Sequence, residues 1–253
     1  MAPHPGTSLG PLTLAEGRWV AAGRTHVGHW RERNEDSLVI DAATNLCAVA
    51  DGMGGAPAGD LASRLAIEAL RTSLPVGPEA RDLAPGFAAA NQALLDVAEH
   101  DPALAGMGTT LSALLLGPSV VAIAHVGDSR IYRFAGRQLT QISVDETLGM
   151  AAVRAGRLSE AEARHRHDWH VLTQVIGSPG GVVPQRYAFR VEPGEMFLLC
   201  SDGLSDMLSD EAIATVFADR PGDPAAITAA LLGQALAAGG RDNITVVVAA
   251  YRG

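Results

Sequence analysis

Lysine is absent from this chain of 253 residues, and all nineteen of its basic residues are arginine. Without lysine there is no phosphate-binding P-loop lysine, no Schiff-base lysine and no kinase-type nucleotide lysine. The absence therefore excludes P-loop enzymes, lysine Schiff-base enzymes and protein kinases.

Cysteine is scarce as well. Cys47 and Cys200 both lie within apolar segments, where cysteine usually behaves as a small hydrophobic residue. Neither is followed six positions later by Arg, so the phosphate-binding loop of cysteine phosphatases is missing. We expect no disulfide framework. No Asp-x-Asp sequence occurs either, which excludes the aspartate nucleophile of haloacid-dehalogenase phosphatases.

Long hydrophobic runs are also missing, because Arg, Asp, Gly or Pro interrupts each apolar stretch before it reaches membrane-spanning length. The N-terminal segment MAPHPGTSLGPLTLAEG lacks the basic start and the apolar stretch of a signal peptide. We therefore expect a cytoplasmic protein without a membrane partner. The net charge of −9 argues against a nucleic-acid-binding surface.

The hydrophobic content of 47% is typical of a globular chain, and the length allows one large domain. We expect a monomer with one domain at residues 19–253, preceded by a poorly ordered, Pro- and Gly-rich tail at residues 1–18. Apolar segments rich in Val, Ile and Leu predict strands at 19–25, 37–40, 46–50, 109–116, 119–126, 131–134, 138–142, 185–191, 196–201 and 244–251.

Three segments have the periodicity of long helices: 57–73, a stretch around 87–98, and a helix that Asp223-Pro224 begins and Gly239-Gly240 ends. Most strands are joined by hairpin-length connections, which indicates antiparallel sheets with helices outside, an α+β domain. Residues 145–170 are polar and helical in character, and Ser159 with Glu162 fits a capping box. We call residues 145–170 the flap.

Four aspartates lie at the ends of apolar strands: Asp51, Asp128, Asp202 and Asp242. Carboxylates that converge on one cleft repel one another unless cations neutralise them, and hard divalent cations prefer oxygen ligands. The pattern therefore indicates a site for several Mg²⁺ or Mn²⁺ ions. Taken singly, each aspartate also fits ordinary turn chemistry, as in Asp51-Gly52.

Six short motifs occur in the order typical of the metal-dependent protein phosphatases of the type 2C-like (PPM) family, particularly its bacterial members. The chain resembles that family over nearly its whole length after the tail. The motifs are Arg31-Glu32-Arg33-Asn34-Glu35-Asp36, Ala50-Asp51-Gly52-Met53-Gly54-Gly55, Met107-Gly108-Thr109-Thr110, Val126-Gly127-Asp128-Ser129-Arg130, Leu199-Cys200-Ser201-Asp202-Gly203-Leu204 and Arg241-Asp242-Asn243-Ile244-Thr245.

The resemblance implies a four-layer α-β-β-α sandwich of two antiparallel sheets flanked by helices. It also implies that Asp51 bridges two tightly bound Mn²⁺ or Mg²⁺ ions. Glu35 and the Gly52 carbonyl would serve one ion, Asp202 and Asp242 the other, and Asp128 with Asp202 a weaker third. Asp36 would lie behind these ligands, and Arg31 would bind the phosphate.

The family chemistry is hydrolysis of phosphoserine and phosphothreonine by in-line attack of a metal-bridged water. The resemblance thus predicts a protein serine/threonine phosphatase that acts on phosphorylated proteins and opposes a bacterial Ser/Thr kinase. The alternative is a catalytically weak phosphoprotein-binding or sensor module on the same fold. The intact aspartates and Arg31 favour the enzyme.

Two positions depart from the family pattern. Met53 stands where eukaryotic relatives carry a His that is proposed to protonate the leaving group, and methionine cannot donate a proton. Gln174 stands where Arg is common. The histidines of the flap, His165, His167 and His170, offer zinc-ligand chemistry, but their polar, Arg-rich surroundings favour surface positions.

Overall fold

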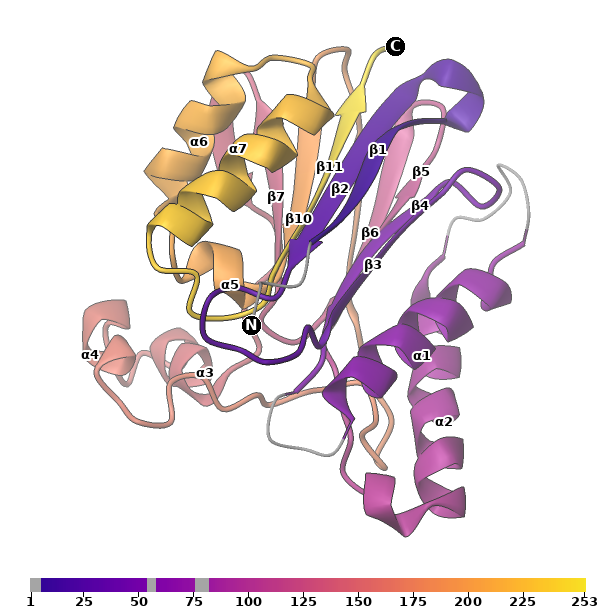
Figure 1. Ribbon diagram of the computed structural model, residues 1–253, viewed down its shortest axis with the longest axis vertical. Helices are drawn as coiled ribbons and strands as arrows, with labels where there is room; N and C mark the ends of the chain where they lie inside the picture. The colour runs from indigo at the N-terminus through magenta and orange to yellow at the C-terminus, as the bar shows by residue number, and fades with distance from the viewer. Residues whose placement is uncertain (1–5, 54–57, 76–81) are drawn as a thin grey trace.

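Two antiparallel sheets packed face to face form the centre of the computed structural model, which describes residues 6–53, 58–75 and 82–253 (Figure 1). The first sheet has the order β1-β2-β11-β10-β7-β8, with β1 (Thr7–Leu14), β2 (Trp19–His26), β11 (Ile244–Tyr251), β10 (Met196–Cys200), β7 (Arg130–Ala135) and β8 (Gln138–Gln141). The second has the order β3-β4-β5-β6-β9, with β3 (Asp36–Asp41), β4 (Leu46–Asp51), β5 (Leu111–Leu116), β6 (Val120–Val126) and β9 (Gln185–Arg190).

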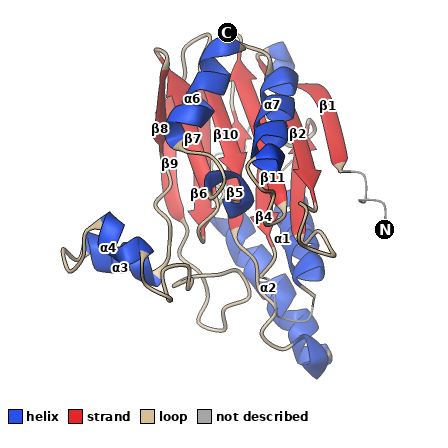
Figure 2. Ribbon diagram, turned by 60° about the vertical axis from the view of Figure 1, so that its left-hand side comes forward, coloured by secondary structure: helices blue, strands red, loops and turns tan. Residues whose placement is uncertain are grey.

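Helices cover both outer faces of this pair of sheets, as Figures 1 and 2 show. The helices α1 (Gly59–Ser73) and α2 (Ala84–His100) pack on the second sheet, and α6 (Asp210–Asp219) and α7 (Pro224–Ala237) on the first. The short helices α3 (Leu148–Arg154) and α4 (Glu160–Arg164) project to one side, and α5 (Asp202–Ser205) follows β10. Single 3-10 turns occupy Ala15–Gly17 and Pro102–Leu104. The predicted four-layer sandwich is confirmed.

The central strands are apolar throughout because both of their faces are buried. In β10, Phe197 and Leu199 enter the core between the two sheets, while Met196, Leu198 and Cys200 pack against α6 and α7. Strand β4 alternates in the same way. This explains why the sequence shows continuous apolar runs instead of a period of two. Both predicted buried cysteines are confirmed as free thiols within these strands.

The N-terminal expectation is wrong for part of the tail. Residues Thr7–Leu14 form β1, which pairs antiparallel with β2 at the edge of the first sheet. The strand is exposed except at Leu14, so it has almost no apolar face for a periodicity argument to detect. Backbone hydrogen bonds to β2 supply its order instead. Residues 1–5 lie outside the described residues.

Helix α6 has no counterpart among the predicted elements, although the sequence does carry its start signal. The Ser209 side chain accepts a hydrogen bond from the Ala212 N–H, and Asp210 and Glu211 occupy the first turn. Two other predicted helix starts are confirmed: Asp223 caps α7, and Ser159 with Glu162 forms the capping box of α4.

Among the described residues, no helix has the length and apolarity that crossing a bilayer requires.

The core between the sheets makes a testable prediction about stability. Leu199 is fully buried there, so we expect Leu199→Ala to lower the free energy of unfolding by about 2–5 kcal/mol in urea denaturation. Leu12→Ala is the matched control, because Leu12 is 39% exposed on β1 and should change stability by less than about 0.5 kcal/mol. Equal losses in the two variants would contradict the assigned core.

Candidate active site

The strand ends that carry the predicted aspartates meet at one edge of the sandwich, around a cleft of about 490 Å³. Asp51 ends β4, Asp128 and Asp202 follow β6 and β10, and Asp242 precedes β11. The residues that line the cleft are Arg31, Glu35, Asp51, Gly52, Met53, Thr110, Asp128, His170, Val171, Leu172, Val175, Asp202, Asp242 and Asn243. All six predicted metal ligands and Arg31 are therefore brought together, although they span more than 200 residues of sequence.

Asp36 lies beneath the cleft and not on its surface. The register of β3 against β4 places it opposite Asp51, and its side chain is buried. The Ser201 hydroxyl donates a hydrogen bond to Asp36 Oδ2 at 2.7 Å, while Oδ1 has no partner among the described residues. Its position agrees with the predicted supporting role, because it links the strand of Asp51 to the residue before Asp202.

The backbone of Asp51 is fixed by two neighbouring threonines. The Asp51 N–H donates to Thr110 Oγ1 at 2.9 Å, and the Asp51 carbonyl oxygen accepts from the Thr110 N–H at 2.9 Å and from Thr109 Oγ1 at 2.8 Å. The sequence analysis singled out these threonines as part of a motif without giving them a role. Their function in the structure is to hold the central aspartate.

Gly52 is required by the close approach of three chain segments. A Cβ at this position would collide with the carbonyl oxygen of Gly59 and would lie 2.7 Å from that of Glu35. The Gly52 N–H donates to the Glu35 carbonyl oxygen at 3.2 Å. The loop before β3, the end of β4 and the start of α1 therefore meet at one point. Gly54 and Gly55 lie outside the described residues.

Asn243 is a site residue that the sequence analysis missed. Its Oδ1 accepts from the Glu35 N–H at 2.8 Å, and its Nδ2 donates to the carbonyl oxygens of Val27 and Arg33 at 3.0 and 2.9 Å. This buried amide fastens the loop that carries Arg31 and Glu35 to the start of β11. In sequence it reads as a turn residue after Asp242, so nothing local reveals its distant partners.

Arg31 pairs with Asp242 within the cleft. Its Nη2 lies 2.7 Å from Asp242 Oδ2, and the two side chains are 45% and 36% exposed. The hydrogen bond to Asp242 raises the pKa of Arg31, so the guanidinium is a permanent positive charge in the cleft. Because both groups are partly solvated, the pair is weak enough to exchange partners.

For Asp51, Asp128 and Asp202, the described residues form no such ion pair. Burial, together with the neighbouring carboxylates, raises the pKa of Asp51 and Asp202 well above the usual value for aspartate. Burial is also the main cause that raises the pKa of Asp128 to about 7. A cluster of buried carboxylates of this kind is electrostatically unfavourable until positive charge joins it.

The donor chemistry fits hard divalent cations, since carboxylate oxygens and the Gly52 backbone carbonyl are ligands that Mg²⁺ and Mn²⁺ prefer. Among the described residues, no group of three or more His, Cys, Asp or Glu side chains has the arrangement needed to hold an ion.

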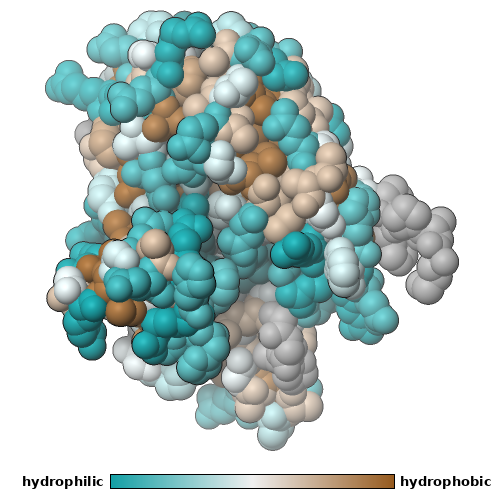
Figure 3. Space-filling model, turned by 90° about the vertical axis from the view of Figure 1, so that its left-hand side faces the viewer, coloured by the Kyte–Doolittle hydropathy of each residue, from teal (hydrophilic) through white to brown (hydrophobic). Residues whose placement is uncertain are grey.

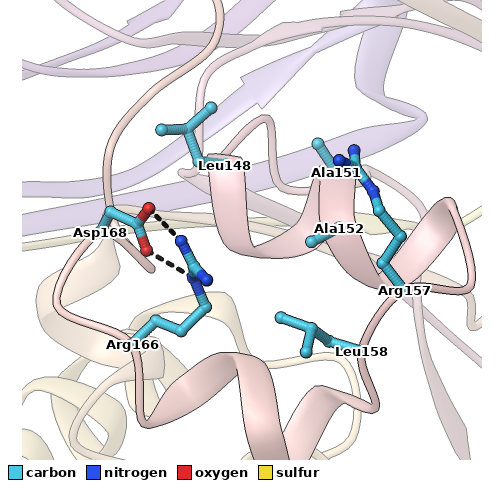
Figure 4. Close-up of a pocket in the computed structure, with 7 residues that line it drawn as sticks. All are labelled: Leu148, Ala151, Ala152, Arg157, Leu158, Arg166 and Asp168. Atoms are coloured by element: carbon cyan, nitrogen blue, oxygen red, sulfur yellow. Dashed lines mark hydrogen bonds and ion pairs between the residues drawn. The ribbon is translucent and has the colours of Figure 1, made fainter.

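The other wall of the cleft is formed by His170, at the end of the flap, and by the two residues that follow it, Val171 and Leu172. Of the remaining flap histidines, His165 forms a hydrogen bond with the Ala161 carbonyl oxygen at 2.7 Å. Gln174, which stands in place of an arginine, donates to both oxygens of Glu146 at 3.1 and 3.0 Å. A second pocket of about 320 Å³ lies within the flap, bordered by α3 (Figure 4).

The two-sheet fold and the cleft define a class of protein, the phosphatases of the 2C type. The family pattern of protein phosphatase 2C matches residues 22–228, so the chain belongs to that family. It is 39% identical over 231 residues to the serine/threonine protein phosphatase PstP of Mycobacterium tuberculosis, covering 90% of this chain and 44% of the relative. It is 34% identical over 233 residues to protein phosphatase PhpP of Streptococcus pneumoniae, covering 88% and 94%.

Solved structures agree with these sequence matches. The catalytic domain of PstP in complex with two manganese ions has a TM-score of 0.82 and 37% identity, over 93% of this chain and 99% of that chain. The predicted family is thus confirmed, and both of these relatives are named as protein phosphatases. This chain spans less than half the length of the M. tuberculosis relative.

The ionisation of Asp36 makes the stability of the fold depend on pH. Burial raises the pKa of Asp36 to about 6 from the ordinary value of 3.8. The folded state then keeps a proton that the unfolded state releases, so this carboxyl stabilises the fold below about pH 4 and loses that effect as pH rises through 6. In EDTA, we expect Asp36→Asn to raise Tm by several degrees at about pH 7.5 and far less at about pH 4.5.

The control for this measurement is Asp96→Asn, because Asp96 is exposed on α2, away from the cleft. The same change in Tm at both pH values in Asp36→Asn would show that the ionisation of Asp36 does not set the stability.

Proposed function

We propose that this chain is a divalent-metal-dependent phosphatase that removes phosphate from phosphoserine and phosphothreonine in proteins. The observation that carries the proposal is the convergence of four aspartates, Glu35 and Arg31 on one cleft. The names of the family relatives support the reaction and the substrate class. We also propose that the protein acts in the cytoplasm, where it opposes a bacterial Ser/Thr kinase.

In this proposal Asp51 contacts two cations. Glu35 and the Gly52 carbonyl serve the first cation, and Asp202 and Asp242 serve the second. The two manganese ions described for the PstP structure support this number. Asp128, together with Asp202, would hold a weaker third ion. When bound, the cations supply positive charge that lowers the pKa of water and polarises the phosphoryl group.

The protein side chains have distinct tasks. Arg31 offers a planar set of N–H donors that matches two phosphate oxygens, and it lines the cleft beside Asp242. Asp242 would hold a cation with the carboxylate that now pairs with Arg31, and the guanidinium would then be available to bind the phosphate. Asp36 and Asn243 hold the loop that carries Arg31 and Glu35 in place against the neighbouring strand ends. Met53 also lines the cleft but cannot donate a proton, so the leaving group takes its proton from another source.

The role of Asp51 is tested by Asp51→Asn. The substitution removes the charge shared by two cations, so we expect Mn²⁺ binding in calorimetry and turnover of a phosphothreonine peptide to fall below about a tenth of wild type. The fold should survive, as judged by circular dichroism. Asp41→Asn is the matched control, because Asp41 is a turn aspartate at the opposite end of the β3–β4 hairpin.

Normal turnover in Asp51→Asn would show that Asp51 is only a turn residue, like Asp41. Intact phosphopeptide binding without any turnover in the wild-type protein would favour the binding-module alternative.

The role of Arg31 is tested separately from that of the metal ligands. We expect Arg31→Ala to lower kcat/KM for the phosphopeptide by one to two decades, because a charge-assisted contact contributes about 1.5–3 kcal/mol. Mn²⁺ affinity should stay the same or rise, since Asp242 loses a competing partner. The measurements are steady-state kinetics and Mn²⁺ calorimetry. Unchanged affinity for inorganic phosphate would show that Arg31 is not the phosphate ligand.

A further inference from the structure

Three exposed apolar side chains belong to chain segments that border the cleft or lie next to one that does. Trp30 is 76% exposed, Val171 49% and Leu148 44%. Trp30 directly precedes Arg31, and Val171 lines the cleft itself. Isolated exposed hydrophobic residues are ordinary, but apolar side chains gathered around a site indicate a binding surface, and Trp is enriched among binding hot spots.

Trp30 is exposed on a well-anchored loop. The His29 N–H donates to the Gly240 carbonyl oxygen at 2.7 Å, and Arg31 pairs with Asp242. Gly28 has a φ of +79°, and a Cβ there would collide with the Asp242 carbonyl oxygen. The residues before Trp30 are therefore fixed to the turn before β11 through the backbone, and the indole is presented to solvent at low entropic cost.

The flap continues this apolar surface on its own side. The Leu148 N–H donates to the Val171 carbonyl oxygen at 2.8 Å, so the two exposed side chains belong to neighbouring backbone segments. Leu148 also borders the flap pocket, together with Leu158, Ala151 and Ala152 (Figure 4). Arg166 and Asp168 form an ion pair at another wall of this pocket.

Apolar patches interrupt the polar surface of the molecule on the face that Figure 3 presents. An apolar wall runs from the cleft, through Val171 and Leu148, into the pocket of about 320 Å³. A cavity of this kind accepts an apolar side chain.

We propose that Trp30, Leu148 and Val171, here called the apolar rim, bind the residues that flank the phosphorylated side chain of the substrate. This inference rests on the proposed function. The substrate class is then a phosphorylated segment in an extended conformation, with bulky apolar residues next to the phosphoserine or phosphothreonine. Such a segment lies across the cleft, with its phosphate at Arg31 and its neighbours on the apolar rim. Phosphate recognition alone would not distinguish one phosphoprotein from another.

The chain contains a spectroscopic probe for this contact. It has three tryptophans, of which Trp19 and Trp169 are 0% and 8% exposed. Acrylamide in solution therefore quenches mainly the fluorescence of Trp30. A peptide bound on the apolar rim should shield Trp30 and reduce the quenching constant.

The test uses two phosphothreonine peptides of equal length and charge, with leucine or glycine on both sides of the phosphothreonine. With Mn²⁺, we expect wild-type kcat/KM to be about tenfold higher for the leucine peptide, mainly through KM. Trp30→Ser and Leu148→Ser should reduce this preference while leaving hydrolysis of phenyl phosphate unchanged. Leu12→Ser is the matched control, with 39% exposure on β1. A non-hydrolysable phosphonate form of the leucine peptide should protect wild-type Trp30 from acrylamide.

The outcomes separate this inference from the proposed function. Absence of any Mn²⁺-dependent hydrolysis, of phenyl phosphate or of either peptide, overturns the proposed function and this inference with it. Hydrolysis of phenyl phosphate with equal kcat/KM for the two peptides, and unchanged quenching at saturating peptide, overturns the apolar rim alone. The quenching measurement needs no variant, so a misfolded mutant cannot leave the question open.

Discussion

Repulsion among buried carboxylates is the constraint on which the rest of this structure depends. Asp51, Asp128 and Asp202 share one cleft, and burial raises the pKa of each, with further increases from neighbouring carboxylates. Such a cluster of buried charges is energetically unfavourable unless cations bind to it. In the part of the chain that the structure describes, Arg31 pairs with Asp242. The same electrostatic demand would therefore account for the proposed cations and for a positive group placed beside them.

The two-sheet core allows the protein to tolerate this arrangement. Strands β4 and β10 are buried on both faces, so their positions are set by packing that does not involve the cleft. Hydrogen bonds to the side chains of Thr110 and Asn243, and one from the Thr109 hydroxyl, then fix the loops at the strand ends. The carboxylates are consequently held by rigid elements, which is how a site keeps its geometry before its ligand arrives.

Much of this could be predicted from the sequence, because the central strands carry strong apolar signals and the aspartates lie at or close to the ends of these strands. The final strand was predicted with its observed bounds, at Ile244–Tyr251. Strand β1 was missed because its order comes from pairing with β2 and not from an apolar face. Asn243 was missed for a related reason: its partners, Val27, Arg33 and Glu35, are distant in sequence. The metal-binding and phosphate-binding roles of the cleft residues stay predictions.

Anomalous diffraction at the manganese absorption edge, on crystals grown with Mn²⁺, tests the central claim most directly. The account predicts at least two strong peaks inside the cleft, one on each side of Asp51, with Asp202 and Asp242 beside one of them. It also predicts that the guanidinium of Arg31 leaves Asp242 in those crystals. Peaks elsewhere, for example at the flap histidines, or an intact Arg31–Asp242 pair with no manganese in the cleft, would contradict it.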